Sequence, residues 1–306
     1  SIDNVRFYNK ELTSSEVNTL RTETGPCPVF TPNLSWDLNE GFWDGSADEV
    51  LDYSGNNLSG QTMNSVTSSL ASPALSGDPG TCGYAQLNGS NRYIQRASSA
   101  LLSPSATLTV SAWVRPASTP SELMTIVSKE TNYEFHINSS RRIYWWWQDT
   151  NNNTRTLTST GQLPLNQWTH VAIRYSSGNQ RIFINGVEDT STSSFTGSLK
   201  TNTVPFEVGR DHAAGRYFNG DIDEIRVYGS ALSTSQILGV RNERKSCSQC
   251  FTEAFVNTAK WYASAYGSGS VIPSIQTNPQ RLRLTTNQIE QATSMTFKRR
   301  FPAAGQ

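Results

Sequence analysis

Four consecutive aromatic residues, Tyr144 to Trp147, form the part of the sequence best suited to contact a ligand. Side chains alternate between the two faces of a strand, so Tyr144 and Trp146 point one way and Trp145 and Trp147 the other. Ile143 shares the face of Trp145 and Trp147, which favours those two as core residues. Tyr144 and Trp146 are therefore candidates for the surface, where large aromatic side chains are unusual without a partner.

Polar residues follow this aromatic run directly: Gln148, Asp149 and the Asn-rich segment 150–153. Flat rings stack on the C–H faces of sugars, while neighbouring polar groups bond the hydroxyls. We therefore expect Tyr144, Trp146 and Asn153 to contact a carbohydrate. The alternative is that all the aromatic residues form a thick core stripe beneath a long loop.

A second group of candidate ligand contacts lies just before the last predicted strand. It consists of Asp211, His212 and Tyr217, in a segment that also contains Arg210 and Arg216. A His beside an Asp is capable of acid–base chemistry, but no Ser or Cys nucleophile motif accompanies the pair. The alternative is an ordinary solvated loop.

Oxygen-bearing side chains near both ends of the main segment offer the chemistry of a calcium site. Calcium binds about six to eight oxygens from carboxylates, amides and backbone. Asp221 and Asp223 lie two residues apart on one predicted strand and so face the same side. The predicted calcium ligands are Glu40, Asp52, Asn57, Asp221 and Asp223. Alternatively, Asp52 and Asn57 only form Asx turns, and Asp223 caps a loop.

The four cysteines are Cys27, Cys82, Cys247 and Cys250. Cys247 and Cys250 have the spacing of half a zinc site, but the sequence has no second pair of this kind and its His residues are scattered. A thioredoxin-like redox site would need a βαβ context, which the sequence does not provide. We favour structural disulfides, which are typical of exported proteins, with Cys27 bonded to Cys82 and Cys247 bonded to Cys250.

An internal repeat sets the organisation of the chain. Residues 2–8 (IDNVRFY) recur at 222–228 (IDEIRVY), and the similarity continues without a gap until Cys27 matches Cys247. Each copy predicts a strand followed by a helix, because each contains a capping box flanked by the residues of a hydrophobic staple. We infer that each copy closes a domain.

The repeat predicts one complete domain at residues 27–246, closed by the second copy. Residues 1–26 are then the closing strand and helix of a preceding repeat. Residues 247–306 have a different composition, and we interpret them as a linker and the truncated start of a further module. This interpretation places Ser1 at an internal cut, which explains why no basic-then-apolar secretory signal opens the chain.

Between residues 27 and 229, short strand patterns follow one another with turn residues between them. Alternating patterns occupy 108–115 and 167–175, and Asn185-Gly186 is typical of a two-residue hairpin turn. These patterns predict an all-β protein, an antiparallel β-sandwich or jelly roll with a short C-terminal helix. They disfavour a propeller, whose blades would repeat every 40 to 50 residues or so.

Composition excludes several classes of function. Charged residues are 16% of the 306 residues, and 25 basic residues balance 25 acidic ones. No net field therefore draws the chain to nucleic acid or to an anionic membrane. No apolar run approaches the roughly 20 residues of a membrane-spanning helix. The neutral, hydroxyl-rich composition fits an exported protein with a neutral ligand.

The order of these motifs resembles a laminin-G-like domain of the concanavalin A-like lectin/glucanase type. The resemblance covers nearly all of residues 30–240 and implies a concanavalin A-like jelly roll. In such domains the edge between the opening loop and the closing strand often holds a structural calcium, which matches the five ligands predicted above. The segments that carry the resemblance are 36–41, 52–57, 86–94, 108–115, 168–172, 184–187, 208–210 and 218–228.

The family resemblance also bears on function and context. In laminin-G-like domains the loop before the closing strand often lines a ligand face, as expected here for Asp211, His212 and Tyr217. Segments 281–285 and 297–302 look like the start of another lectin-like module. The tandem layout with flanking cysteines resembles the MshQ-type proteins of mannose-sensitive haemagglutinin pili.

We therefore predict a non-catalytic recognition module of a bacterial surface or pilus-associated protein. Its partners would be a carbohydrate or other surface polymer, adjacent modules of the same chain and pilus components, with Ca²⁺ as a structural or ligand-binding ion. One alternative is a structural spacer in a surface fibre. The other is a glycoside hydrolase with paired carboxylates, although residues 221–224 depart in spacing from the signature they resemble.

Overall fold

The structure is a computed structural model that describes residues 31–69, 82–176, 178–195 and 197–243, together with residues 13–14. It also gives the backbone of two strand pairs between 261 and 297. The chain divides into two units, Ser1–Thr31 and Pro32–Gln306. Most of the first unit lies outside the described residues, and so does the first copy of the repeat apart from Thr13 and Ser14.

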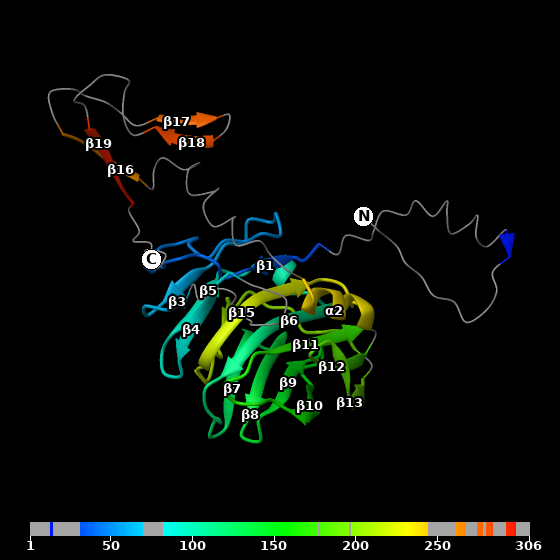
Figure 1. The fold of residues 1–306 in the computed structure, drawn as a ribbon. Helices are drawn as coiled ribbons and strands as arrows, with labels where there is room; N and C mark the ends of the chain where they lie inside the picture. Colours follow the sequence, from blue (N-terminus) through cyan, green and yellow to red (C-terminus); the bar gives the residue numbers. More distant parts are fainter. Residues whose placement is uncertain are drawn as a thin grey trace. The chain divides into compact units, whose positions relative to one another are not determined.

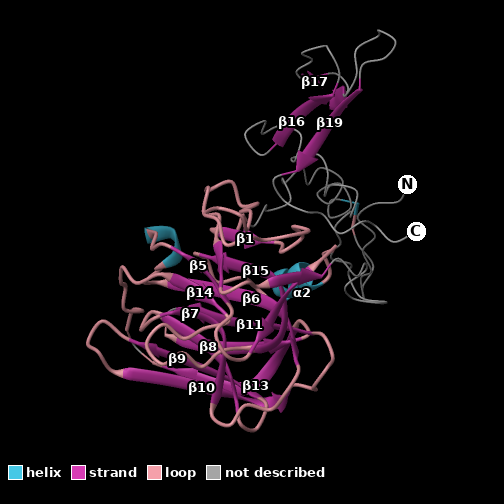
Figure 2. Cartoon of the chain, turned by 90° about the vertical axis from the view of Figure 1, so that its left-hand side faces the viewer, coloured by secondary structure: helices cyan, strands magenta, loops and turns pink. Residues whose placement is uncertain are grey.

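Two antiparallel sheets face each other in the second unit, which confirms the predicted β-sandwich (Figures 1 and 2). One sheet has eight strands in the order β13-β12-β11-β6-β15-β4-β3, with β1 also paired to β15. Its strands are β1 (Leu34–Trp36), β3 (Thr67–Ser69), β4 (Tyr84–Asn88), β6 (Thr107–Pro116), β11 (Thr169–Ser176), β12 (Asn179–Ile184), β13 (Val187–Ser194) and β15 (Asn219–Tyr228).

The other sheet has seven strands in the order β10-β9-β8-β7-β14-β5-β2. These strands are β2 (Gln61–Met63), β5 (Tyr93–Arg96), β7 (Leu123–Lys129), β8 (Tyr133–Asn138), β9 (Arg142–Gln148), β10 (Thr154–Gln162) and β14 (Phe206–Val208). Two further pairs, β16 (Trp261–Tyr266) with β19 (Ala292–Phe297) and β17 (Ser274–Thr277) with β18 (Gln280–Arg283), form small separate sheets.

The core lies between the two large sheets and follows from the alternation of their strands. Leu108, Val110 and Val114 of β6 are fully buried on the inner face, as the alternating pattern predicts. Trp147 of β9 meets Tyr175 of β11 edge-to-face, with ring centroids 5.0 Å apart, and so joins the two sheets.

A short helix, α2 (Thr234–Arg241), closes the sandwich at its C-terminal end. Ser233 and Gln236 form the predicted capping box, in which the side chain of each residue accepts the backbone N–H of the other. Leu232 and Ile237 are buried in one small cluster with Phe183, on the outer face of the eight-stranded sheet. The helix therefore covers part of that face.

Other local predictions can be compared with the structure. Asn185 and Gly186 both have positive φ, 52° and 78°, in the turn between β12 and β13, as a type I′ hairpin requires. Cys82 is disulfide-bonded, but its partner lies outside the described residues. Since Cys27, Cys247 and Cys250 also lie outside them, the predicted pairing stays a prediction.

Two edge strands, β10 of one sheet and β13 of the other, are joined mainly through the side chain of Asp189, beside a contact between the Thr160 and Thr190 hydroxyls at 2.8 Å. The Asp189 carboxylate accepts the backbone N–H groups of Thr160 and Gly161, each at 2.9 Å. Asp189 belongs to β13 and its two donors belong to β10. A single carboxylate thus spans from the last strand of one sheet to the last strand of the other.

Candidate ligand-binding face

The outer face of the seven-stranded sheet carries the aromatic residues that the sequence assigned to the surface. Trp145 and Trp147 are fully buried in the core, whereas Tyr144 and Trp146 are only half-buried. Ile143 is also in the core, as predicted from its position on the strand. Alternation on β9 therefore orients the four aromatic residues as expected.

Polar side chains stand beside these two aromatic rings. Across the β8–β9 pair, His136 lies opposite Tyr144 and Glu134 lies opposite Trp146. The His136 and Tyr144 rings are 6.2 Å apart at a tilt of 31°. Further along, Thr125 of β7 lies opposite His136. The outer face therefore presents two aromatic rings next to ionisable and hydroxyl groups.

The loop between β14 and β15 is attached to β7 beside this face. Its tip is closed by reciprocal backbone hydrogen bonds between Asp211 and Gly215, at 2.7 and 2.9 Å. The backbone N–H of Thr125 donates to the carbonyl of Arg216 at 2.9 Å. The Asp211 carboxylate accepts from the Arg216 guanidinium at 3.0 Å, and its other oxygen accepts two backbone N–H groups of the loop.

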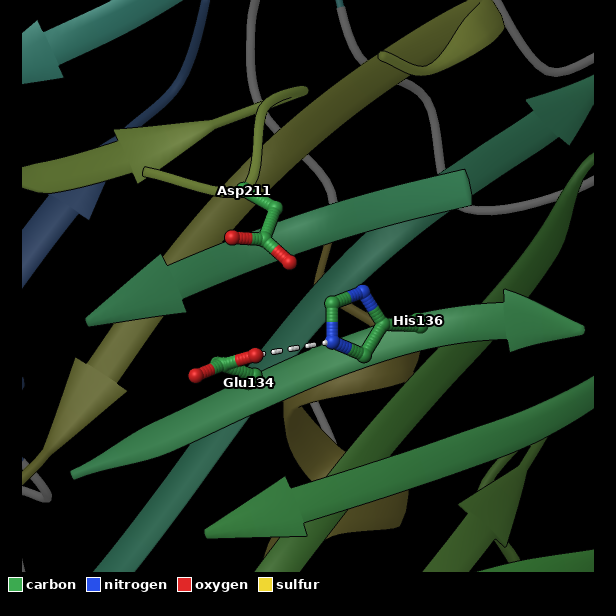
Figure 3. Close-up of side chains that lie close together, drawn as sticks. All are labelled: Glu134, His136 and Asp211. Atoms are coloured by element: carbon green, nitrogen blue, oxygen red, sulfur yellow. Dashed lines mark hydrogen bonds and ion pairs between the residues drawn. The ribbon is translucent and has the colours of Figure 1, made fainter. Parts of the chain in front are cut away.

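Asp211 faces Glu134 and His136 of β8, as Figure 3 shows. One potential ligand atom from each of these three buried side chains lies within 4.8 Å of the others. His136 Nε2 lies 3.3 Å from Glu134 Oε2, and Nδ1 lies 3.0 Å from the Thr125 hydroxyl. The second Glu134 oxygen accepts the backbone N–H of Thr131 at 3.1 Å.

Sequence reasoning identified Asp211 but missed Glu134 and His136. One local signal could have placed Glu134 and His136 on the same face of β8. Residues 133–137 alternate apolar and polar side chains, so both polar groups point to one side of the strand. The alternation does not show that β8 lies beside the strand of Tyr144 and Trp146. That placement depends on the order of strands in the sheet.

The other predicted ligand contacts are spread more widely. His212 Nδ1 lies 3.2 Å from Glu207 Oε1, on the neighbouring strand β14. The Tyr217 ring lies 6.2 Å from the ring of Tyr93. The Asn153 amide donates to both oxygens of Asp149, at 3.2 and 3.1 Å, and so stabilises its own turn at the end of β9.

Three of the predicted calcium ligands lie in the long loop between β1 and β2. The Asp52 carboxylate accepts backbone N–H groups of Ser35, Ser54 and Leu58 at 3.0, 3.0 and 2.8 Å. Glu40 accepts from Leu51 at 2.8 Å, and burial raises its pKa to about 7. Asn57 adopts a positive φ of 57°.

The two remaining predicted ligands lie on β15. Asp221 and Asp223 flank Ile222, whose side chain is in the core, so both lie on the other face of β15, on the same side as expected. Asp221 forms an ion pair with Arg115 at 2.7 Å, and Arg115 stacks over the Tyr84 ring. None of the five belongs to the three-residue group around His136. Calcium binding at these residues stays a prediction.

Comparison with known proteins supports the fold. A family model described as concanavalin A-like lectin/glucanases superfamily matches residues 88–238. No curated protein matches the sequence. Among the described residues, no helix combines the length and the apolar character needed to cross a bilayer.

Several solved structures are similar in fold. The binding domain of Paraclostridial Mosquitocidal Protein 1 is 18% identical over 69% of this chain and 52% of its own, with a TM-score of 0.54. The binding domain of botulinum neurotoxin serotype D is 20% identical over 69% and 51%, with a TM-score of 0.51. This chain thus spans about half the length of these proteins. The structural similarity shows a shared fold, which is concanavalin A-like.

Proposed function

We propose that the sandwich is a non-catalytic binding module that recognises carbohydrate, or another surface polymer, on the outer face of its seven-stranded sheet. The observation that carries the proposal is the half-buried pair Tyr144 and Trp146 on β9. Both rings project from one side of the strand, about 7 Å apart along it. Large aromatic side chains left partly open to solvent in this way favour a partner.

The polar surroundings favour a hydroxyl-rich ligand. Thr156 and Thr158 of β10 lie opposite Trp146 and Tyr144 and are exposed. Their hydroxyl groups both donate and accept hydrogen bonds. A ligand that stacks on the rings therefore meets polar groups at the edge of the sheet. A neutral carbohydrate offers both kinds of contact.

The carboxylates of this face favour binding over glycoside hydrolysis. Glu134, which lies opposite Trp146, and Asp211, which faces it, are only 4% and 2% exposed. Both already accept hydrogen bonds, from Thr131 and His136 in one case and from the 213–216 segment in the other. A hydrolytic pair needs access to the glycosidic oxygen and to water.

We place the module in an exported protein at the bacterial surface, in a pilus-associated chain of tandem modules. The disulfide at Cys82 supports an oxidising compartment. The repeated closing segment, residues 2–8 and 222–228, supports adjacent modules. The same repeat favours a second candidate, a spacer module in a surface fibre, which would have no ligand of its own. In the first case calcium would be a structural ion near Asp52 and Asp221.

A glycan-array screen of the full chain tests the proposal and separates it from the spacer. The wild type is expected to bind at least one glycan class. Trp146→Ala is expected to weaken that binding by tenfold or more, with little change in Tm. Phe42→Ala is the matched control, because Phe42 is a 38% exposed aromatic residue in a different loop.

Two results would contradict the binding proposal: no glycan bound by the wild type, or equal binding by Trp146→Ala. A parallel screen with EDTA tests calcium separately. Loss of binding or a lower Tm with EDTA, restored by Ca²⁺, is expected if calcium is bound. An unchanged Tm and unchanged binding would remove calcium from the proposal and leave the aromatic site in place.

A further inference from the structure

The group of Glu134, His136 and Asp211 has no part in stacking a sugar, yet it is assembled from distant parts of the chain. Glu134 and His136 come from β8, and Asp211 comes from the loop after β14 (Figure 3). All three are buried, with His136 fully inaccessible. Among the described residues, it is the group of three metal-ligating side chains whose ligand atoms approach within 4.8 Å.

The charge around this group is unbalanced. Besides Glu134 and Asp211, two more carboxylates are present, Glu207 on β14 and Glu130 after β7. Glu130 and Asp211 share one donor, the backbone N–H of Ala213, at 3.2 and 3.0 Å. Two guanidiniums oppose the four carboxylates, Arg210 on Glu207 and Arg216 on Asp211. The carboxylates therefore outnumber the guanidiniums, and burial raises the pKa of both Glu130 and Glu207. A bound cation would be favoured in these surroundings.

One of these carboxylate oxygens is left without a partner. Glu207 is fully buried, and its Oε1 accepts from Arg210 and His212. Its Oε2 is buried with no hydrogen-bond partner. An unsatisfied buried carboxylate oxygen is costly. A cation close by would offset part of that cost.

His136 is held in the orientation that a metal ligand needs. Its Nδ1 is within hydrogen-bond distance of the Thr125 hydroxyl, at 3.0 Å. A second hydrogen bond of this kind commonly fixes the ring of a ligating histidine. The other nitrogen, Nε2, points toward the Glu134 carboxylate, where Figure 3 shows the contact.

We propose that Glu134, His136 and Asp211 bind one divalent transition-metal ion of the zinc class. Glu134 Oε2, His136 Nε2 and one Asp211 oxygen are the ligands, and water completes the coordination. Zinc accepts nitrogen and oxygen ligands in sets of three with an open fourth position. Calcium does not fit, because it needs more oxygens and disfavours nitrogen.

The protons balance in this exchange. In the neutral ring with its proton on Nε2, the proton is donated to Glu134. With the metal on the Nε2 lone pair, the neutral ring would carry its proton on Nδ1 and donate it to the Thr125 hydroxyl. No net proton is released from a neutral His136.

The ion would tie the 209–217 loop to β8, directly beside the proposed ligand rings. His136 lies opposite Tyr144 and Glu134 lies opposite Trp146. The loop already has two backbone hydrogen bonds to β7, from Thr125 N–H to the Arg216 carbonyl and from Gly209 N–H to the Ile126 carbonyl, both at 2.9 Å. The ion would add a link to β8 that depends on metal. Zinc should therefore raise the Tm of the folded chain.

Zinc binding by the full chain tests the proposal. The protein is stripped with EDTA, dialysed and titrated with Zn²⁺ alone by calorimetry. One tight equivalent and a raised Tm are expected for the wild type. His136→Gln and Asp211→Asn are each expected to weaken that equivalent at least tenfold. The matched control is His212→Gln, which changes a half-buried histidine of the same loop outside the proposed ligand set. This variant should bind Zn²⁺ as the wild type does.

Further measurements keep the test decisive. Far-UV circular dichroism checks that the buried His136→Gln variant folds, and Asp211→Asn changes a loop residue instead. Co²⁺ should bind with weak d–d bands and without thiolate charge-transfer absorption. The proposal is overturned by absence of a stoichiometric site, by undiminished binding in both variants, by a thiolate band, which assigns the ion to cysteine, or by Ca²⁺ binding more tightly than Zn²⁺.

Discussion

Two histidines on opposite outer faces of the sandwich are equally buried but have opposite surroundings. His170, on β11 of the eight-stranded sheet, is 1% exposed, and neither ring nitrogen has a hydrogen-bond partner. Its ring meets Trp113 edge-to-face at 5.4 Å. Burial first, and then the positive charges of Arg226 and Arg241, lower the pKa of His170 to about 3.

His136, on β8 of the seven-stranded sheet, is fully buried but has partners on both nitrogens. Its nearest charged neighbours are the carboxylates Glu134 and Asp211, although Asp211 is also paired with Arg216. Burial alone therefore does not decide what a histidine does. The first is an apolar packing group beneath a helix, and the second lies among groups that attract a cation.

The largest difference between the two faces is expected in packing energy. Phe183 is fully buried beneath α2, so Phe183→Ala should lower the unfolding free energy by about 3–5 kcal/mol. Tyr144→Ala on the opposite face should cost about 1 kcal/mol, because that ring is only half-buried. Urea unfolding of both variants measures the contrast. Equal losses would mean that the seven-stranded face is also covered.

The next difference concerns pH and His170. Its pKa is depressed in the fold, so stability is complete above the unfolded pKa of about 6.5 and is lost as pH falls toward 3. Between these values protons bind to the unfolded state and not to the folded one. At pH 4 the loss from this group should be about 3 kcal/mol.

His170→Phe keeps a ring against Trp113 and removes the titration. Urea unfolding from pH 7 to pH 4 measures the unfolding free energy of both proteins. That of the variant should decline by about 3 kcal/mol less than that of the wild type. Other groups titrate in both proteins, so the difference between them isolates His170. Parallel pH profiles would show that the folded protein accommodates a charged His170.

The smallest effect is expected at the helix that covers the first face. Ser233→Ala removes the N-cap of α2, because the Ser233 hydroxyl accepts the N–H of Gln236 at 3.3 Å. The expected loss is about 1 kcal/mol by thermal or urea unfolding. The same substitution at Ser235 is the control and should cost less, because the Ser235 hydroxyl contacts that of Ser233 at 3.0 Å but is not the acceptor of the capping bond from Gln236 N–H. A loss at Ser235 as large as at Ser233 would assign the effect to something other than capping.

Much of the fold was predictable because its signals are local. The alternation at Ile143, Trp145 and Trp147 fixes which face of β9 is core, and the sequence from Ser233 to Gln236 fixes the start of α2. Each signal depends on residues within a few positions of one another. Such local signals, repeated along residues 27–229 and combined with the family resemblance, were enough to predict the sandwich and its closing helix.

The site was less predictable because its parts are distant in sequence. Asp221 and Asp223 do face one side, as expected, but the Arg115 that pairs with Asp221 is 106 residues away. Likewise, Asp211 reaches Glu134 and His136 only through the order β8-β7-β14 in the sheet. The spacing of residues along the sequence does not predict which strands become neighbours in the sheet.

Asp189 has a consequence for how such molecules behave when crowded. The edge of a sheet normally offers unpaired N–H groups to another chain, which leads to intermolecular strand pairing and aggregation. Here the N–H groups of Thr160 and Gly161 on β10 are already bonded to the Asp189 carboxylate of β13. At this end of the sandwich these two N–H groups are therefore unavailable to a strand of a neighbouring copy, so Asp189 protects that part of the β10 edge against intermolecular pairing.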